Sequence, residues 1–328
     1  MSERGVSKEQ FKRYVEEALE KIKEVDVSKL GAEEFDAFID KYVQRRRLVG
    51  SRYSCFVVLD GYVVALSRVH FGNVSTGRFN LIKKVLIENK EIPLISENAF
   101  RGILGHYLRS LSRRMGIGEP TCGLYDESGQ KFECGKCLKC GIMGFLNPGK
   151  GLNAPHRLNF RAFIPTAYSI VRETHNTIHP MRECVHAPRE EGVSRSGEER
   201  AGRRAIFFTS EYIAPGAKFP VQITMRDMAC GEMGLALMAM NMAWHFIGVG
   251  RHKVGSFSTW EQRPEDWKLL YFRPPDVMEP EVYEGDALVD LVDKLKRCAY
   301  LAMEKRLFMN YEPLNLAGRS IDEQAEFW

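Results

Sequence analysis

The order of hydrophobic and polar residues predicts a chain built from both helices and strands. Apolar residues recur at three- and four-residue steps over residues 8–44, as in amphipathic helices. Residues 53–69 are rich in β-branched and aromatic residues, which favours a strand. A further helix is expected from Ser96, because serine caps helix N-termini and apolar residues at helical spacing follow it.

The second half of the chain supplies the other elements of a layered fold. They are two strands around a turn (206–209 and 219–224), a helix without charged residues (233–247), a short strand (268–272) and an amphipathic helix (286–306). The order strand, helix, two strands, helix, strand fits a ferredoxin-like α+β core. Residues 115–150 and 172–204 lack this periodicity and are expected to be insertions.

Composition excludes several classes of protein. Of the 328 residues, 44% are hydrophobic and 27% charged, which is ordinary for a globular protein and unlike collagen, a coiled coil or a disordered tail. The net charge of +4 does not indicate a partner, and eight cysteines are too few for a disulfide scaffold of this length. Residues 233–250 lack Asp, Glu, Lys and Arg, but the run is short and contains Asn241 and His245. We therefore expect a buried helix there, no membrane partner and a cytoplasmic protein.

Four cysteines have the spacing of a structural metal site. They are Cys122, Cys134, Cys137 and Cys140. A C-x2-C step allows two thiolates to bind one ion, and four sulfurs leave no open coordination position, so the sequence predicts a structural Zn²⁺. An iron–sulfur cluster is an alternative, although the Cys-Pro continuation of ferredoxin motifs is missing, and free or disulfide-paired cysteines are another. His106 or His156 could replace Cys122 as the fourth ligand.

Basic residues concentrate in the predicted insertions. Residues 101–204 contain 17 Lys and Arg against 10 Asp and Glu. Six arginines lie on a glycine- and serine-rich stretch that can follow a phosphate backbone. They are Arg182, Arg189, Arg195, Arg200, Arg203 and Arg204. The alternative is a solvated loop whose four glutamates neutralise it.

Two further basic motifs and one histidine pair stand out. The glycine loop 248–256 carries Arg251, His252 and Lys253 and lets backbone N–H groups approach an anion, but it does not match a nucleotide-binding P-loop. Arg45, Arg46 and Arg47 form a cluster that is alternatively a cationic helix C-terminus. His175 and His179 have the spacing of metalloprotease ligands. Asn176 replaces the catalytic glutamate and Pro180 ends any helix there, so hydrolase chemistry is not favoured.

Several of these motifs, in this order, resemble the RAMP superfamily of CRISPR RNA-binding proteins. They are the helix start at 95–102, the cysteine cluster followed by residues 142–144, and the apolar helix leading into the glycine loop. Residues 175–178 and 205–209 look like the borders of the long hairpin, or thumb, of backbone subunits. Over residues 53–272 the chain is most similar to the backbone subunits of type I-D CRISPR interference (Cascade) complexes.

The resemblance implies an RRM-like (ferredoxin-like) core with a zinc-binding insertion, a thumb and flanking helices. The implied segments are an N-terminal helical segment (residues 1–50), a core in two parts (51–114 and 205–275), the zinc insertion (115–150), the thumb (151–204) and a C-terminal helical segment (276–328). Copies of the chain would form a filament along a guide RNA, without reading its sequence. The implied partners are guide RNA, with the target strand as a further candidate, other copies of the chain and other subunits of the complex.

The resemblance also bears on catalysis. Some relatives in type III complexes cleave target RNA with an aspartate in the loop after the first strand, but residues 61–87 contain no Asp or Glu. We therefore expect a binding subunit and no enzyme, while Glu183 or Asp227 remain acids that another segment could supply. The expected RNA-binding residues are Arg45, Arg46, Arg101, His175, His179, Arg182, Arg203, Arg204, Arg251, His252 and Lys253. A metal-dependent ruler endoribonuclease, a zinc-stabilised protein-interaction module and an iron–sulfur protein are the alternatives.

Overall fold

The structure is a computed structural model of the chain. It describes ten segments: residues 9–48, 55–72, 74–76, 79–125, 132–147, 152–161, 163–177, 206–247, 255–273 and 279–313. Helices and strands are mixed, which confirms the predicted α+β class.

The main body is built on a five-stranded antiparallel sheet with the order β14-β13-β2-β12-β9. Its strands are β2 (Phe56–Val64), β9 (Leu158–Phe160), β12 (Lys218–Arg226), β13 (Trp267–Phe272) and β14 (Glu281–Glu284). Leu59 on the central strand pairs with Ile223 on one side and Leu269 on the other, and all three are fully buried. Alternate residues of β12 are buried as well, so this face of the sheet forms the floor of the core.

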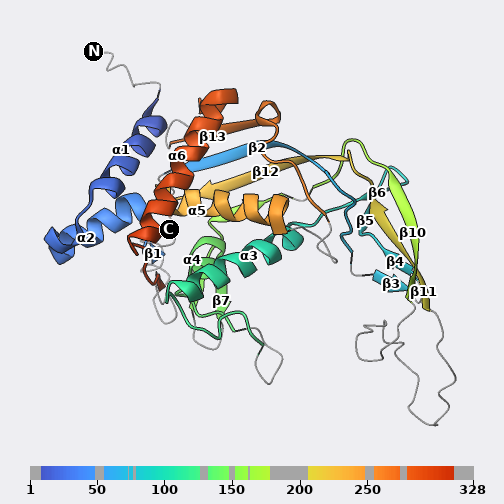
Figure 1. Cartoon of the computed structure of the whole chain (residues 1–328), viewed down its shortest axis with the longest axis horizontal. Helices are drawn as coiled ribbons and strands as arrows, with labels where there is room; N and C mark the ends of the chain where they lie inside the picture. Colours follow the sequence, from blue (N-terminus) through green and yellow to red (C-terminus); the bar gives the residue numbers. More distant parts are fainter. Residues whose placement is uncertain are drawn as a thin grey trace, which may run out of the picture.

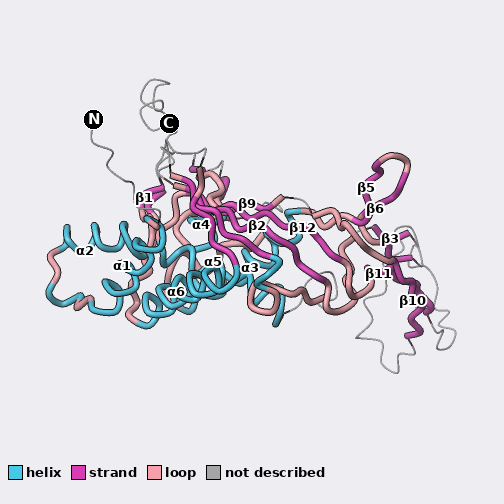
Figure 2. The backbone as a smooth tube through the Cα atoms, turned by 90° about the horizontal axis from the view of Figure 1, so that it is seen from above, coloured by secondary structure: helices cyan, strands magenta, loops and turns pink. Residues whose placement is uncertain are grey.

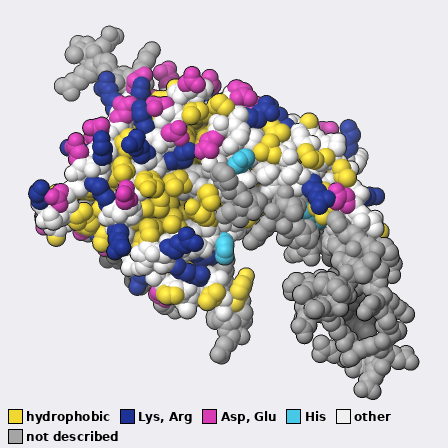
Figure 3. Space-filling model, in the orientation of Figure 1, with side chains coloured by type: hydrophobic (Ala, Val, Ile, Leu, Met, Phe, Trp, Pro, Cys, Tyr) yellow, Lys and Arg dark blue, Asp and Glu magenta, His cyan; other side chains and the backbone are white. Residues whose placement is uncertain are grey.

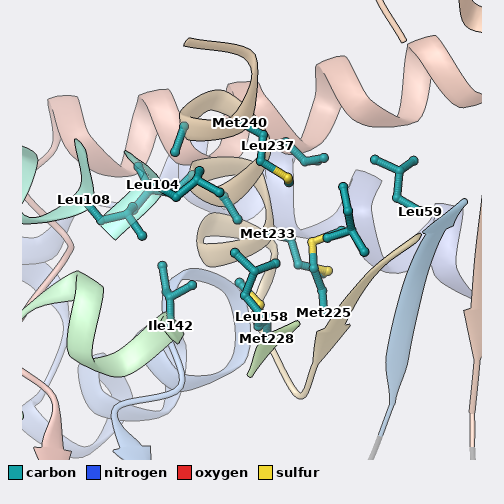
Figure 4. Packing of buried hydrophobic residues seen from close by; sticks show 14 of the residues in the cluster. Leu59, Leu104, Leu108, Ile142, Leu158, Met225, Met228, Met233, Leu237 and Met240 are labelled. Atoms are coloured by element: carbon teal, nitrogen blue, oxygen red, sulfur yellow. The ribbon is translucent and has the colours of Figure 1, made fainter. Parts of the chain in front are cut away.

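Three long helices pack together over the sheet: α3 (Glu97–Arg114), α5 (Cys230–Asn241) and α6 (Gly285–Glu304). Figure 2 shows the helices gathered along one side of the strands. Phe100, Leu104 and Leu108 are buried on α3 at four-residue steps. Figure 4 shows the core from close by, where Leu104 and Leu237 from two helices join side chains of the sheet in one cluster.

The uncharged helix of the sequence is α5, and it is buried almost all round, as predicted. Gly234 explains how closely it approaches its neighbour, since a Cβ there would lie 1.9 Å from the carbonyl oxygen of Leu295 on α6. A π-helical turn, Met242–Ile247, extends α5. Within the part of the chain that the structure describes, no helix is long and apolar enough to cross a membrane.

A second sheet projects from the body, at the right of Figure 1. It has the order β10-β11-β4-β3 and consists of β3 (Val74–Thr76), β4 (Phe79–Leu81), β10 (Ile170–Thr177) and β11 (Ile206–Ile213). The hairpin of β5 (Lys84–Ile87) and β6 (Lys90–Pro93) lies beside it. Buried Glu211 on β11 joins the two, because its carboxylate binds Lys84 of β5 and Arg172 of β10.

The second sheet corrects one feature of the sequence analysis. The predicted strand at 206–209 is part of β11 and pairs with β10, so the turn at 214–216 connects strands of two different sheets. The place beside β12 in the main sheet is taken by β9. An apolar strand does not reveal its partner by its own pattern, and β9 has only three residues, which is too short for a periodicity signal.

The described N-terminal and C-terminal segments pack together on the main body. The N-terminal elements are α1 (Gln10–Glu24), a 3-10 turn Val27–Lys29, α2 (Ala32–Phe38) and a π-helical turn Ile39–Val43, and α1 packs on α6. A short parallel pair then joins β1 (Arg47–Leu48) to β15 (Glu312–Pro313). The inserted segment after α3 contains α4 (Leu138–Met143) and the pair β7 (Phe145–Asn147) and β8 (Leu152–Ala154), and a 3-10 turn at Pro264–Asp266 precedes β13.

Candidate metal centre and nucleic-acid interface

The four predicted cysteines come together in the folded chain. All four are buried, and their sulfur atoms lie within 4.8 Å of one another. The Sγ atom of Cys122 lies 3.6 Å from that of Cys137 and 3.7 Å from that of Cys140. A tetrahedral ion with Zn–S bonds of 2.3 Å separates its sulfurs by about 3.8 Å. The cluster therefore has the dimensions of a site for one tetrahedral metal ion.

The electrostatics of the cluster also fit a cation. Hydrogen bonds from the neighbouring thiols, first that of Cys122, lower the pKa of Cys134, whereas the bonds with Cys122 raise the pKa of Cys140. Four sulfurs this close cannot all be thiolates unless a positive charge compensates them. The backbone N–H of Lys136 donates to Cys134 Sγ at 3.4 Å, and this hydrogen bond also stabilises negative charge on that sulfur.

Local structure explains why the cysteines converge. Gly135 has a positive φ of 74° and turns the chain between Cys134 and Cys137. Gly118 has a φ of 77° and leaves room for Cys137, since a Cβ there would lie 2.4 Å from that of the cysteine. Ser112 of α3 accepts a hydrogen bond from the backbone N–H of Leu138 at 3.0 Å and thereby caps α4.

The two histidines considered as alternative ligands lie elsewhere. His106 is exposed on α3, and Nδ1 of His156 hydrogen-bonds to the carbonyl oxygen of Met143. Within the described residues the four cysteines are the only group of three or more His, Cys, Asp and Glu side chains arranged to hold a metal ion. Cys122, and neither histidine, therefore lies where a fourth ligand of such an ion would be.

A buried ion pair fixes the cysteine segment to the main body. Arg157, beside β9, binds the carboxylate of Glu232 on α5 through both Nη atoms and donates from Nε to the carbonyl oxygen of Gly141 at 2.9 Å. The hydroxyl of Tyr311 donates to the same carboxylate at 2.6 Å, and its ring packs on Gly141. One network thus links α4, the sheet, α5 and the C-terminal segment.

Arg101 is a predicted RNA-binding residue whose side-chain partners the structure gives. It lies on the first turns of α3, with 19% of its side chain exposed, and donates to Oδ1 of Asn159 at 3.2 Å. Its ion pair with Glu97 is long, at 3.8 Å, and its Nε has no hydrogen-bond partner among the described residues. Arg101 therefore retains donors for an anion.

Arg45 and Arg46 have carboxylate partners. Arg45 binds Asp40 at 3.0 Å, and Arg46 binds both Asp36 and Glu312. The pair of Arg46 with Glu312 joins the N-terminal segment to the C-terminal one, whereas the pairs with Asp36 and Asp40 lie within the N-terminal segment. The geometry gives both arginines a structural role before any ligand is considered.

The remaining predicted RNA-binding residues cannot be placed in the same way. The backbone of His175 lies on β10 opposite Phe208. The others lie outside the described residues: His179, Arg182, Arg203, Arg204, Arg251, His252 and Lys253. Strands β10 and β11 pair in register as far as Thr177 and Ile206, with residues 178–205 between them.

Carboxylates near the loop after β2 are bound to cations. Glu173 pairs with Arg68, which lies in that loop. Glu211 pairs with Lys84 and Arg172, and its carbonyl oxygen hydrogen-bonds to His70 Nδ1 at 2.7 Å. Both carboxylates are thus engaged in ion pairs rather than grouped around a metal position.

Three basic side chains that were not predicted to bind RNA line a hollow together with Arg101. Arg109, Lys139 and His156 line the same hollow between α3, α4 and the segment after β8. Arg109 could have been found, because it lies eight residues after Arg101 and so on the same helix face. Lys139 and His156 come from distant segments and carry no such signal.

Comparisons with known proteins find similarity to CRISPR proteins. No curated protein matches it. Three solved structures are similar: Thermofilum pendens Csc2 (13% identity, 80% of this chain and 79% of that one, TM-score 0.36), the Csm3-Csm4 subcomplex of the type III-A CRISPR-Cas interference complex (14%, 75% and 98%, 0.40), and the type III-B Cmr-beta complex bound to cognate target RNA (15%, 62% and 59%, 0.36). At such scores these likenesses assign no function. Residues 98–256, which contain α3 from its second residue, the cysteine cluster, β12 and α5, match the model of the family described as Csc2 Crispr.

Proposed function

We propose that the chain is a guide-RNA-binding backbone subunit of a type I-D CRISPR effector complex, with a structural zinc ion and no catalytic site. The match of residues 98–256 to the Csc2 family carries this proposal. It covers the whole cysteine cluster and the helix that presents Arg101.

The arrangement of the main sheet supports an RRM-like core. The chain runs through β2, α3, β9, β12, α5 and β13, a βαββαβ order, with every neighbouring pair of strands antiparallel. In the proposal, the second sheet, which contains β10 and β11, carries the thumb. Copies of the chain stack into a filament along the RNA.

Zinc is the metal that the cysteine cluster favours. Four buried sulfurs separated by the edge of a single tetrahedron suit one ion, whereas the cysteines of a multi-iron cluster ligate different irons and lie farther apart. Its role would be structural, because the four sulfurs complete the coordination shell.

The alternative of a metal-dependent endoribonuclease finds less support. Asp227 lies beside the start of β2, at the opposite end of that strand from the loop that follows it, since its backbone N–H donates to the carbonyl oxygen of Cys55. Glu183 lies outside the described residues.

The proposal is tested by anisotropy of labelled single-stranded RNA over a salt series, beside single- and double-stranded DNA. We expect tight binding to single strands, with log affinity falling linearly as log salt rises, and weaker binding by an Arg203→Glu/Arg204→Glu variant. RNA affinity at the detection floor in low salt would refute the proposal and favour a protein-interaction module. Metal-dependent cutting of the RNA at regular spacing would instead identify a nuclease.

A further inference from the structure

The hollow between α3 and the cysteine segment is a cationic site of about 650 Å³. The described residues that line it include three cations, Arg101, Arg109 and Lys139, against one carboxylate, Glu133, which is already bound to Lys139. Figure 3 shows Lys and Arg side chains and a histidine gathered over this part of the molecule. The hollow therefore has a surplus of positive charge, which a ligand with several negative charges would balance.

The two arginines of the hollow have donors left for such a ligand. Nε of Arg101 and Nη1 of Arg109 are buried and have no hydrogen-bond partner among the described residues. A buried N–H group without a partner is unfavourable, because it has lost its contact with water and gained none in return. Carboxylates suit these donors, since the two oxygens of a carboxylate match the N–H groups of a guanidinium group.

The last described residues of the chain lie beside this hollow. The backbone N–H of Tyr311 donates to the carbonyl oxygen of Lys136 at 3.0 Å, which fixes this part of the chain to the cysteine segment. Strand β15 then lies against β8, and Ala154 of β8 lines the hollow. Residues 314–322, which follow Pro313, span at most about 30 Å when extended, which is enough to carry the next residues across the hollow from its β8 side.

The sequence beyond the described residues contains the negative charge that would balance the hollow. Residues 319–328 carry three carboxylates against one guanidinium group, together with two adjacent aromatic side chains. These residues are Asp322, Glu323, Glu326, Arg319, Phe327 and Trp328. Leu146, which is 64% exposed, offers apolar surface at the rim of the hollow. The segment thus matches the hollow both in charge and in apolar surface.

We propose that residues 319–328 dock into the hollow of their own chain, with their three carboxylates on its cations and their aromatic pair beside Leu146. A tethered segment acts at an effective concentration in the millimolar range, so weak contacts are enough to hold it there. Docking covers Arg101, so the segment competes with RNA for the chain's cations. The competition rests on the proposed function, whereas the docking itself does not.

Photo-crosslinking in the full, zinc-loaded chain tests the docking directly. With p-benzoylphenylalanine in place of Gln324, we expect cross-links within one chain to peptides that contain the lining residues of α3, α4 and β8, identified by mass spectrometry. Gly102→Glu places a negative charge in the hollow, and Gly102→Gln has nearly the same size and no charge. Both variants should fold, because a Cβ on Gly102 would meet nothing within 4 Å. We expect the yield of these cross-links to be at least about fivefold lower in Gly102→Glu than in Gly102→Gln.

Binding of labelled single-stranded RNA tests the competition. Two triple variants with the same net charge are compared: Asp322→Asn/Glu323→Gln/Glu326→Gln in the segment, and Glu20→Gln/Glu24→Gln/Glu279→Gln, which removes exposed carboxylates of α1 and of the residues before β14. We expect the first to bind RNA about three- to tenfold more tightly than the second at low salt. The difference should shrink as salt screens the contact between the segment and the hollow.

The outcomes separate this inference from the proposed function. Cross-links that map away from the hollow, or that form equally in both Gly102 variants, would overturn the docking. Cross-links found only in covalent dimers would overturn it in favour of a segment supplied by a second copy of the chain. Equal RNA affinities of the two triple variants would overturn the competition. Absence of RNA binding by the wild type and by both triple variants, beside the expected cross-links in the hollow, would refute the proposed function and support the docking.

Discussion

Replacing Arg157 by methionine would break the buried ion pair that links the cysteine segment to the main body. Methionine fills much of the same volume but leaves the carboxylate of Glu232 without its cation, at 0% exposure. The carbonyl oxygens of Gly141 and Asp227 lose the hydrogen bonds that Arg157 now donates at 2.9 Å.

The magnitude follows from what remains around the carboxylate. Removing one partner of a buried pair costs about 3–5 kcal/mol. Glu232 keeps three donors, the hydroxyl of Tyr311 and the backbone N–H groups of Ala229 and Arg45, at 2.6, 2.9 and 3.2 Å, so its own share should be near the lower end. The two lost hydrogen bonds to the carbonyl groups of Gly141 and Asp227 bring the expected loss to about 4–5 kcal/mol of unfolding free energy.

Urea unfolding of the zinc-loaded chain, followed by tryptophan fluorescence, measures this loss. The double variant Arg157→Met/Glu232→Gln is the matched control, because it removes the buried charge as well. We expect it to be more stable than Arg157→Met alone, by about 1–2 kcal/mol. A single variant that loses less than about 1 kcal/mol, or a double variant less stable than the single one, would refute the argument that an uncompensated charge dominates.

Further predictions concern the metal, one titrating group and two glycines. Cys137→Ser should lose the bound zinc measured by mass spectrometry and several kcal/mol of stability, whereas the buried Cys298→Ser should keep one zinc per chain; a brown iron-containing protein would contradict zinc. Burial alone would raise the pKa of Glu211, but its cationic partners lower it below the usual value. Its charge therefore stabilises the fold at neutral pH, and this contribution disappears as pH falls through the lowered pKa. Glu211→Gln should thus lower the thermal midpoint at pH 7 and converge on the wild type in acid, and a difference that is independent of pH would count against it. Gly141→Ala should destabilise the fold by about 1–3 kcal/mol, since its Cβ would lie 2.1 Å from the ring of Tyr311. Gly102→Ala should stabilise the fold by up to about 1 kcal/mol, because alanine favours a helix and its Cβ would meet no other atom within 4 Å. The thermal midpoints of the two variants test this, and equal midpoints would contradict both predictions.

Parts of the site could be predicted from the sequence because they are local. The spacing of the cysteines indicates a metal site, and three of the four lie close together in the sequence, from the turn at Gly135 into α4. Arg101 is marked by its position at a helix start. Lys139 and His156 could not be predicted as its neighbours, because nothing local relates α4 or the segment after β8 to a face of α3.

The sequence alone did not reveal that Arg45 and Arg46 have carboxylate partners. Their sequence reads as a cationic cluster, but chain segments brought from both ends supply Asp36, Asp40 and Glu312 as partners. Charge patterning counts residues along the chain, whereas an ion pair depends on which carboxylate the fold places within reach.

The sequence by itself determined the helices at 97–114, 230–241 and 285–304 within a few residues, the central strands, the buried character of α5 and the set of cysteines. These depend on periodicity and spacing, which act over a few residues. Only the tertiary structure decided that β11 leaves the main sheet, that β9 takes the edge beside β12, and that Arg157 and Glu232 meet in the core. Strand pairing and buried ion pairs are contacts between distant segments, and their energies depend on the whole arrangement rather than on any one stretch of residues.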